Sequence, residues 1–378
     1  MNVHSGVGTD NLHCTVQTTI SGCFSFPHIG PRSICRLVDL QLTLNQRNTC
    51  GALPRASGCS RLAAVRRLSG VVLCSYKLSM PLLPYILDRI TAANGPLGDK
   101  LHAYVDSMDS VFHERAEAFL GRYDRFIVST GRSLDFGIDC YMELRDSMME
   151  ENLYFMRTGE YSSKSFAEVN QRVYSNPQTM QYHMHGLVLA QFLWPDQYRR
   201  FSFFSDNLPS YKPQIRRYLE IGSGHGLYLV EAVRILGSGT EFEAVDISVS
   251  SMELAQGIAV DAPCRFRLMD IFDLPEDQTY DFITMGEVLE HVEQPRDLLH
   301  RLHSLLTPEG RAYITTPANA PTRDHIYLFH NADEIRDMLN SSGLSIEREV
   351  TQYASDLPQK KAEKLKVPLM FGAFVKKV

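Results

Sequence analysis

No stretch of this chain approaches the roughly 18 consecutive apolar residues that a membrane-spanning helix needs. We therefore expect a soluble, cytoplasmic protein, and a hydrophobic content of 44% is enough for a sizeable core. The sequence also lacks any Cys-x2-Cys pair, which excludes the common zinc-binding patterns. It contains no internal repeat. With 378 residues, it can form two domains of ordinary size.

Acidic residues are scarce in the first 79 positions, which hold eight Lys or Arg but only Asp10 and Asp39. The net charge of this segment is +6, whereas the remainder of the chain carries −12. The segment resembles a transit peptide in composition, and a disulfide-rich domain is an alternative because six of the eight cysteines lie here. We favour a third interpretation, a disordered or spurious extension over residues 1–79, because ordinary amphipathic sequence begins directly after Met80.

Residues 80–210 have apolar positions three and four apart with charges between them, which predicts helices. Asn176-Pro177 has the form of a helix start, and Trp194-Pro195 should end that helix. We expect this region to be a helical cap that covers a substrate.

Between residues 211 and 378, short apolar runs alternate with helical stretches. Strands are expected at 217–221, 242–246, 265–269, 280–285, 311–316, 344–352 and 368–377, and helices at 226–236, 250–259, 295–306 and 331–341. The alternation indicates an α/β fold with a parallel sheet and helices on both faces. The last two strands could form an antiparallel pair at the sheet edge, with a charged loop or short helix at 359–366 between them.

Three glycines alternate in the stretch "YLEIGSGHGLYLVEAV", between an apolar run and a helical pattern. Gly222, Gly224 and Gly226 would let the backbone approach a nucleotide at the end of the first strand, although a tight turn without a ligand is the alternative. A dinucleotide fingerprint requires Gly or Ala at its sixth position, where this chain has Leu227.

Carboxylates lie at the ends of the first four predicted strands, namely Glu220, Asp246, Asp270 and Glu287. Asp246 is placed to accept hydrogen bonds from both ribose hydroxyls of a nucleotide. Asp270 can accept one from an adenine amino group, while Ile271 packs on the ring. Because parallel strands end at the same edge of a sheet, all four carboxylates are expected to converge on one ligand.

The ordered motifs "LEIGSGHG", "VDIS", "MDIFDLP", "YDFITMGEVLEHVEQP", "LLTPEGRAYITTP" and "EIRDMLNSSGL" resemble those of class I S-adenosylmethionine-dependent methyltransferases. The resemblance covers about residues 214–353 and is greatest to the small-molecule branch, which includes the ubiquinone-biosynthesis type. It implies a Rossmann-like sheet of seven strands whose final strand is reversed, with S-adenosyl-L-methionine as the cofactor.

The resemblance also implies which residues contact this cofactor. Glu220 and the first glycines would line the methionine part, Asp246 the ribose, Asp270 the adenine, and Glu287 the sulfonium. The cofactor site expected in this way comprises Glu220, Gly222, Ser223, Gly224, Asp246, Ile247, Asp270, Ile271 and Glu287.

Methyl transfer to an oxygen or nitrogen can require a general base near the methyl group. His325 is the first candidate because it follows the fifth strand, where substrates of this fold usually meet the enzyme; a structural loop histidine is the alternative. His183 is the second, on the predicted cap helix. It lies two residues from His185, so the two side chains should point to different faces and at most one should reach the site. The expected substrate contacts are Tyr174, Tyr182 and Asp324.

No metal is expected, because His325 and His330 flank an aromatic run without a carboxylate-rich pattern. An NAD-linked oxidoreductase is disfavoured by Leu227 and by the third carboxylate, Asp270. A non-catalytic binding protein is disfavoured because the carboxylates of the cofactor site are intact. A nucleic-acid substrate is not expected from a chain that carries −12 outside its first 79 residues.

The sequence thus predicts a methyltransferase that acts on an oxygen, nitrogen or carbon atom of a small molecule. A protein or carrier-bound substrate remains the alternative, although the helical cap favours an enclosed site. Neither nucleic acid nor membrane is expected as a partner, and a homodimer is compatible with the sequence.

Overall fold

The structure is a computed structural model that describes residues 81–355 and 357–378. These described residues belong to one compact unit. The interpretation of residues 1–79 as an extension therefore lies outside the described residues.

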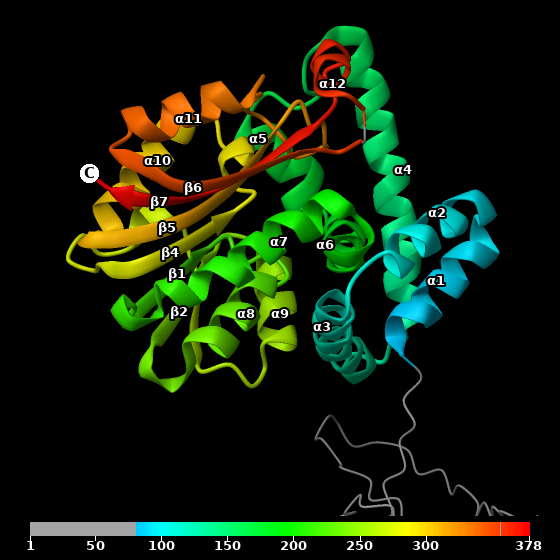
Figure 1. Ribbon diagram of the computed structural model, residues 1–378, viewed down its shortest axis with the longest axis horizontal. Coiled ribbons are helices and arrows are strands. Elements are labelled where there is room, and N and C mark those ends of the chain that lie inside the picture. The colour runs from blue at the N-terminus through cyan, green and yellow to red at the C-terminus, as the bar shows by residue number, and fades with distance from the viewer. Residues whose placement is uncertain (1–80, 356) are drawn as a thin grey trace, which may run out of the picture. The chain divides into compact units, whose positions relative to one another are not determined.

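Helices form the first part of the described chain (Figure 1). They are α1 (Leu82–Ala93), α2 (Gly95–Asp106), α3 (Ser110–Ser129), α4 (Leu134–Thr158), α5 (Phe166–Val169), the π-helical turn η1 (Asn170–Tyr174), α6 (Pro177–Leu193) and α7 (Pro195–Asn207). The Asn176 side chain caps α6 by accepting hydrogen bonds from the amides of Gln178 and Thr179. α6 ends before Trp194-Pro195 as predicted, because the residue before a proline is disfavoured in helical conformation.

These helices share a core, which we call the cap core and which also includes Leu254 and Ile258 from the part of the chain that follows the cap. Phe112, Tyr123, Val188 and Phe192 are among its fully buried members. The pairing of α4 with α6 is close, since a Cβ atom on Gly186 would lie 2.8 Å from the carbonyl oxygen of Cys140. The helical prediction for this region is therefore matched by helices that pack on one another.

A seven-stranded sheet follows, in the order β3-β2-β1-β4-β5-β7-β6. The strands are β1 (Arg217–Ile221), β2 (Glu241–Asp246), β3 (Cys264–Leu268), β4 (Tyr280–Gly286), β5 (Leu306–Ala318), β6 (Leu344–Tyr353) and β7 (Leu369–Lys377). β7 runs antiparallel to both β5 and β6, whereas the pairings among β1 to β5 are parallel. The predicted α/β fold with a reversed final strand is confirmed.

Helices cover both faces of this sheet (Figure 1). α8 (Leu227–Leu236), α9 (Val249–Ile258) and α7 lie on one side, and α10 (Pro295–Leu305) and α11 (Ala332–Ser341) on the other, while α12 (Gln359–Lys364) links β6 to β7. Successive strand residues alternate between the two cores: Tyr218 packs with α8 and Phe204 of α7, whereas Leu219 packs with α10 and α11. Short 3-10 turns complete the path, namely η2 (Leu208–Ser210), η3 (Lys212–Gln214), η4 (Gly237–Gly239), η5 (Ile271–Asp273) and η6 (Leu289–His291).

One boundary differs clearly from its prediction. β5 begins at Leu306 rather than 311, because Leu306 pairs with Tyr280 ahead of a bulge at 307–310, and pairing with β4 resumes at Arg311. The register of that pair shifts between Tyr280 and Phe282, which accommodates the irregular start.

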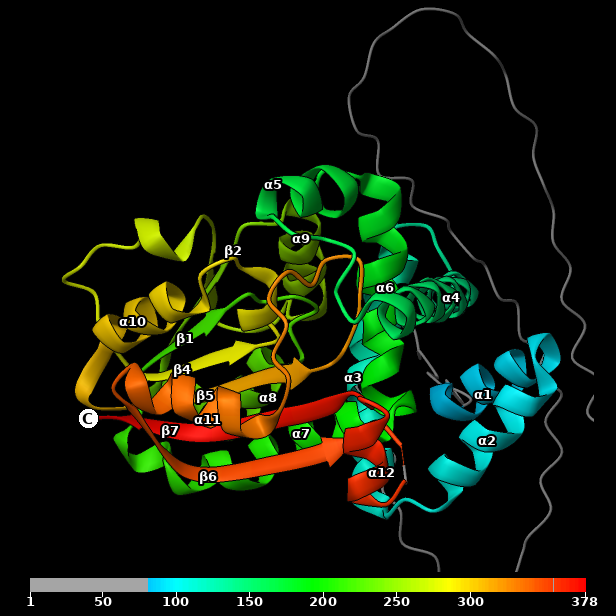
Figure 2. The ribbon, with the colours of Figure 1, turned by 90° about the horizontal axis from the view of Figure 1, so that it is seen from above.

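The cap helices stand beside the edge at which the parallel strands end (Figure 2). α3 and α6 contact α9, and α7 contacts α8, β6 and β7, so the cap joins the sheet through several elements. Within the described residues, none of the helices has both the length and the apolar character required to cross a bilayer.

Candidate functional site

The glycine turn after β1 exposes its backbone to a cavity. Gly222, Gly224 and Gly226 have φ of +70°, +51° and +77°, which glycine adopts without steric cost. A Cβ on Gly222 would lie 2.7 Å from Cγ2 of Val288, so packing also requires glycine there. On Gly224 the nearest atoms to such a Cβ would be 3.9 Å away. The backbone at Gly224 is therefore open to a ligand.

Asp246, at the end of β2, supports this turn. Its carboxylate accepts hydrogen bonds from the amides of Ser248 at 2.8 Å and Gly224 at 3.2 Å, and from Oγ of Ser223 at 3.4 Å. Burial raises the pKa of Asp246, and these donors oppose that rise. The carboxylate thus connects the first two strand ends at the cavity.

The other predicted strand-end carboxylates have different surroundings. Glu220 is buried and accepts a hydrogen bond from the Tyr218 hydroxyl at 3.1 Å, and burial raises its pKa to about 8. Asp270 is exposed and accepts one from the Phe272 amide at 3.0 Å. The four carboxylates lie around one cavity, as the strand-end pattern predicted.

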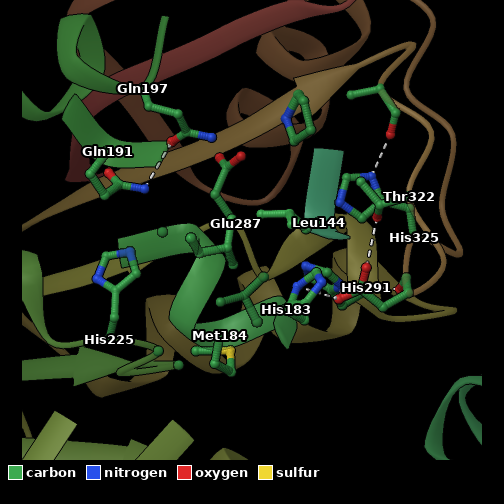
Figure 3. A pocket seen from close by; sticks show the side chains of 18 of the residues that line it. Leu144, His183, Met184, Gln191, Gln197, His225, Glu287, His291, Thr322 and His325 are labelled. Atoms are coloured by element: carbon green, nitrogen blue, oxygen red, sulfur yellow. Dashed lines mark hydrogen bonds and ion pairs between the residues drawn. The ribbon is translucent and has the colours of Figure 1, made fainter. Parts of the chain in front are cut away.

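This cavity has a volume of about 1200 Å³ and extends from the glycine turn to the cap helices. Figure 3 shows Glu287 and the hydrogen-bonded pair Gln191–Gln197 on one side, with His183 and His325 on the other. Its lining includes all nine residues of the expected cofactor site. A typical pocket for one small ligand is about 300–1,000 Å³, so this cavity has room for a cofactor and a second molecule.

Glu287 follows β4 and has an unusual backbone, with φ of +56° in a residue other than glycine. Its amide donates to the carbonyl of Thr315 at 3.0 Å, and its carboxylate accepts from Oγ1 of the same residue at 2.8 Å. The carboxylate also pairs with the buried guanidinium of Arg200. Burial acts to raise the pKa of Glu287, but the Arg200 charge and these hydrogen bonds hold that pKa below its usual value.

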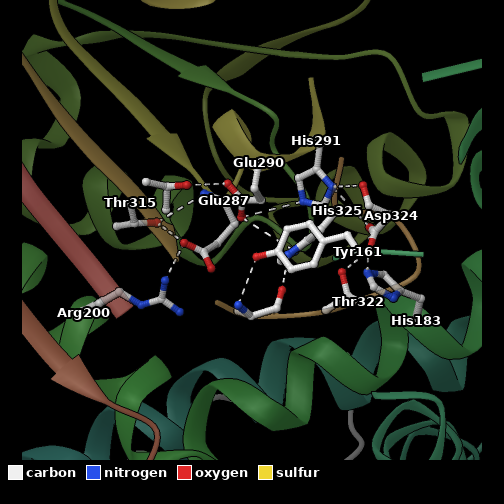
Figure 4. Close-up of polar contacts among 12 residues, drawn as sticks. Tyr161, His183, Arg200, Glu287, Glu290, His291, Thr315, Thr322, Asp324 and His325 are labelled. Atoms are coloured by element: carbon white, nitrogen blue, oxygen red, sulfur yellow. Dashed lines mark hydrogen bonds and ion pairs between the residues drawn. The ribbon is translucent and has the colours of Figure 1, made fainter. Parts of the chain in front are cut away.

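A polar cluster lies where the loop after β5 meets α6 (Figure 4). The buried Asp324 carboxylate is 3.4 Å from Nε2 of His183 and 3.5 Å from Nδ1 of His291. Oγ1 of Thr322 donates to it at 2.7 Å. Burial acts to raise the pKa of Asp324, but the neighbouring histidines lower it well below its usual range. Asp324 is therefore a charged partner for the imidazoles around it.

His325 faces a different environment in the same cluster. Its Nδ1 lies 2.6 Å from the carbonyl oxygen of Ala320, so this nitrogen carries the proton and donates. Its Nε2 is 3.9 Å from a buried oxygen of Glu290. Burial and the nearby His291 lower the pKa of His325 to about 4. The ring packs edge-on against Tyr161, with a centroid separation of 5.7 Å.

Glu290, His291 and His325 could together hold a metal ion, since their ligand atoms lie within 4.8 Å of one another. Burial raises the pKa of Glu290 to about 8, and its Oε1 has no hydrogen-bond partner within the described part of the chain. The pair of histidines discussed from the sequence as possible metal ligands was His325 and His330. His330, however, is exposed and absent from the cavity lining.

The structure separates some residues that the sequence grouped as substrate contacts. Tyr174 lines the cavity, and its hydroxyl is 3.2 Å from Nδ1 of His291. Tyr182 does not line the cavity. It precedes His183 by one residue on α6, so its side chain points in a different direction, towards α4, where its hydroxyl lies 3.5 Å from Oγ of Ser147. His185 also points elsewhere, to the Tyr123 hydroxyl at 2.9 Å, as its spacing from His183 predicted.

Two residues of the site escaped sequence reasoning. Arg200 is a buried, charged residue of α7. Its position four residues before the buried Phe204 places it on the same face of the helix, and that spacing could have indicated its burial. Glu290 was embedded in "GEVLEHV", three residues after Glu287, and nothing in the sequence distinguished its burial.

Comparison with known proteins agrees with this geometry. Residues 193–353 match a family model described as a methyltransferase domain. The mitochondrial ubiquinone biosynthesis O-methyltransferase of Schizosaccharomyces pombe is 37% identical over 106 residues, which is 27% of this chain and 38% of that protein. The ubiquinone biosynthesis O-methyltransferase of Xanthomonas oryzae pv. oryzae is 28% identical over 109 residues, covering 28% and 44%. The chain thus spans less than half of the length of these curated relatives.

One similar solved structure is that of the N-methyltransferase NodS from Bradyrhizobium japonicum in complex with S-adenosyl-l-homocysteine. Its sequence is 16% identical to this chain, and the TM-score is 0.41. The match covers 57% of this chain and 99% of that one. The family match confirms the resemblance predicted from the motifs.

Proposed function

We propose that this chain, whose residues 193–353 form a class I S-adenosylmethionine-dependent methyltransferase domain, transfers a methyl group to a small acceptor held under the helical cap. The observation that carries the proposal is the single cavity that joins the nine expected cofactor residues to the His183–Asp324 pair. Because the matched relatives are named O-methyltransferases, we take the acceptor atom to be a hydroxyl oxygen.

The cofactor, S-adenosyl-L-methionine, supplies an electrophilic methyl group on a sulfonium. The residues around the cavity fit it, because the backbone at Gly224 is open and the carboxylates of Asp246 and Asp270 lie at the same cavity. Asp246 would accept from the ribose hydroxyls, Asp270 from the adenine amino group, and Glu287 would place a negative charge beside the sulfonium.

His183 is the general base that the geometry supports best. Its Nε2 faces the Asp324 carboxylate, which leaves Nδ1 as the nitrogen that can accept a proton. The carboxylate stabilises the imidazolium that forms, as in other acid–imidazole pairs. His325, the first candidate from the sequence, becomes the second, because burial and the nearby His291 lower its pKa to about 4 and make it a weaker base.

The cap contributes by enclosing the acceptor. α4 and α6 supply apolar walls, including Leu144 and Leu187, so water is displaced around the reacting atoms. Methyl transfer needs the donor carbon and the acceptor oxygen in line, and holding both in one cavity supplies that alignment. We propose on this basis that residues 80–210 act as the substrate-covering part of the chain.

The test is methyl transfer from S-adenosyl-L-methionine to hydroxyaryl acceptors, measured in wild type and in His183→Ala. Loss of a positioned base should lower turnover by about 10²–10⁴-fold, while the affinity for S-adenosylhomocysteine stays the same. His325→Ala is measured beside it, and His300→Ala, on the exposed side of α10, is the matched control.

If His325→Ala alone abolishes turnover, the base is His325. A parallel fall in cofactor affinity in His183→Ala would make that residue structural. Failure of the wild type to bind S-adenosylhomocysteine would contradict the proposed function itself.

A further inference from the structure

The charged residues that line the cavity are unevenly distributed. Its lysine and arginine residues, within the described chain, are Lys100 of α2 and Arg145 of α4. Both belong to the cap. Apart from Asp196 of α7, the acidic lining residues come from the strand ends and loops of the sheet: Glu220, Asp246, Asp270, Glu287, Glu293 and Asp324. Both cations of the lining are therefore supplied by the cap, whereas most of its acids are supplied by the sheet.

Arg145 is the more enclosed of the two cations. It is half-buried, whereas Lys100 is exposed. In residues 81–355 and 357–378, no hydrogen bond or ion pair engages the Arg145 guanidinium. The group offers five N–H donors in a planar arrangement and always carries its charge. A partly desolvated cation without a partner is unfavourable, and a bound anion would compensate it.

The surroundings of Arg145 are otherwise apolar or already engaged. Leu144, Met148 and Trp194, which also line the cavity, pack in one apolar cluster beside it. The Tyr141 hydroxyl accepts a hydrogen bond from Nε1 of Trp194 at 3.1 Å. Burial raises the pKa of that hydroxyl to about 12, and the Arg145 charge acts in the opposite direction, which places the guanidinium near it. A ligand here would meet an apolar wall and one free cationic fork.

We propose that the methyl acceptor carries an anionic oxygen group, a carboxylate or a phosphate, that Arg145 binds at the cap end of the cavity. The inference rests on the proposed function, since it assigns the reacting hydroxyl of the acceptor to His183 and Asp324. An arginine fork matches the two oxygens of a carboxylate or phosphate, so it selects for this group as well as attracting it.

The proposal is tested by binding, independently of turnover. The probes are 3-(3,4-dihydroxyphenyl)propanoate, its methyl ester and 2-(3,4-dihydroxyphenyl)ethyl phosphate, with shorter and longer homologues of each. Calorimetry with S-adenosylhomocysteine present should show the anionic probes binding about 10–100-fold more tightly than the ester, as expected for charge-assisted hydrogen bonds. The carboxylate and phosphate series then show which anion is preferred.

Arg145→Met should abolish this preference, and Arg145→Lys should retain part of it. Arg157→Met, an exposed arginine of the same helix outside the cavity, is the matched control and should leave the preference intact. Unfolding temperature and S-adenosylhomocysteine affinity check that each variant folds.

Equal binding of acid and ester by the wild type at every chain length would overturn the proposal without any variant. So would a preference that survives Arg145→Met, or no binding of any probe at millimolar concentration. A clear preference for anions with no methyl transfer to any probe would count against the hydroxyl acceptor instead, and would leave the anion site in place.

Discussion

Replacing Asp246 with alanine should weaken cofactor binding more than it weakens the fold. In the structure the carboxylate already holds the amides of Gly224 and Ser248 and Oγ of Ser223. Losing an acceptor for these partly buried donors should lower the free energy of unfolding by about 1–2 kcal/mol. Losing the two ribose hydroxyls as partners should cost a further ~1.5–3 kcal/mol of binding free energy, or roughly a 10- to 150-fold rise in Kd.

Asp246→Asn separates these two effects. The asparagine oxygen can still accept from one or two turn donors, but its amino group cannot accept from a ribose hydroxyl. We expect it to keep most of the stability and to lose most of the affinity for S-adenosylhomocysteine, measured by calorimetry beside thermal unfolding. Asp270→Ala should have a smaller effect, since that carboxylate is exposed. Unchanged affinity in Asp246→Ala would refute the ribose assignment.

Two further predictions concern stability. Burial lowers the pKa of His185 to about 4 in the folded state, so the unfolded chain binds more protons between about pH 4 and 6.5. The contribution of His185 to stability should therefore be lost as pH drops through this window, by up to ~3 kcal/mol. Because the pKa values of His225 and His325 are also lowered to about 4, His185→Gln should make the pH dependence of the free energy of unfolding shallower without abolishing it. An unchanged slope in denaturant titrations at several pH values would contradict the prediction. Gly222→Ala should destabilise the protein by more than the ~1 kcal/mol of backbone strain expected in Gly159→Ala. Both positions have φ of at least +70°, but the nearest atom to the added Cβ lies at 2.7 Å at Gly222 and at 3.6 Å at Gly159. Equal losses in chemical denaturation would show that the clash relaxes.

The sheet was largely predictable because its signals are local. Buried parallel strands are short apolar runs, and each was bounded by a turn or a helix start, as at Gly222 after β1. The position of the carboxylates followed from topology alone, since parallel strands end at one edge. β5 was predicted to begin at 311, and the pairing missed before it is the isolated one of Leu306 with Tyr280, which depends on a bulge at 307–310 that only the neighbouring β4 reveals.

The remainder of the site depends on contacts between distant segments. Tyr182 and His183 are adjacent in sequence, and only the packing of α6 against α4 determines which of them reaches the cavity. Arg200 and Glu287 are far apart in the chain, and their pairing requires α7 to lie over the end of β4. Arg145 had no motif at all, because its significance comes from the partner that it lacks within the described residues.

The strand order has a consequence for how the protein folds during synthesis. β7 is the seventh strand to be made but occupies the position between β5 and β6. β6 has no sheet neighbour of its own until Leu369–Lys377 is available, because its pairing partner is β7. Until then the open side of β5 offers unpaired backbone groups, which is the kind of edge at which nascent chains associate wrongly. A ribosome-stalled chain that ends before β7 should therefore be more protease-sensitive over β6 than over β1 to β4.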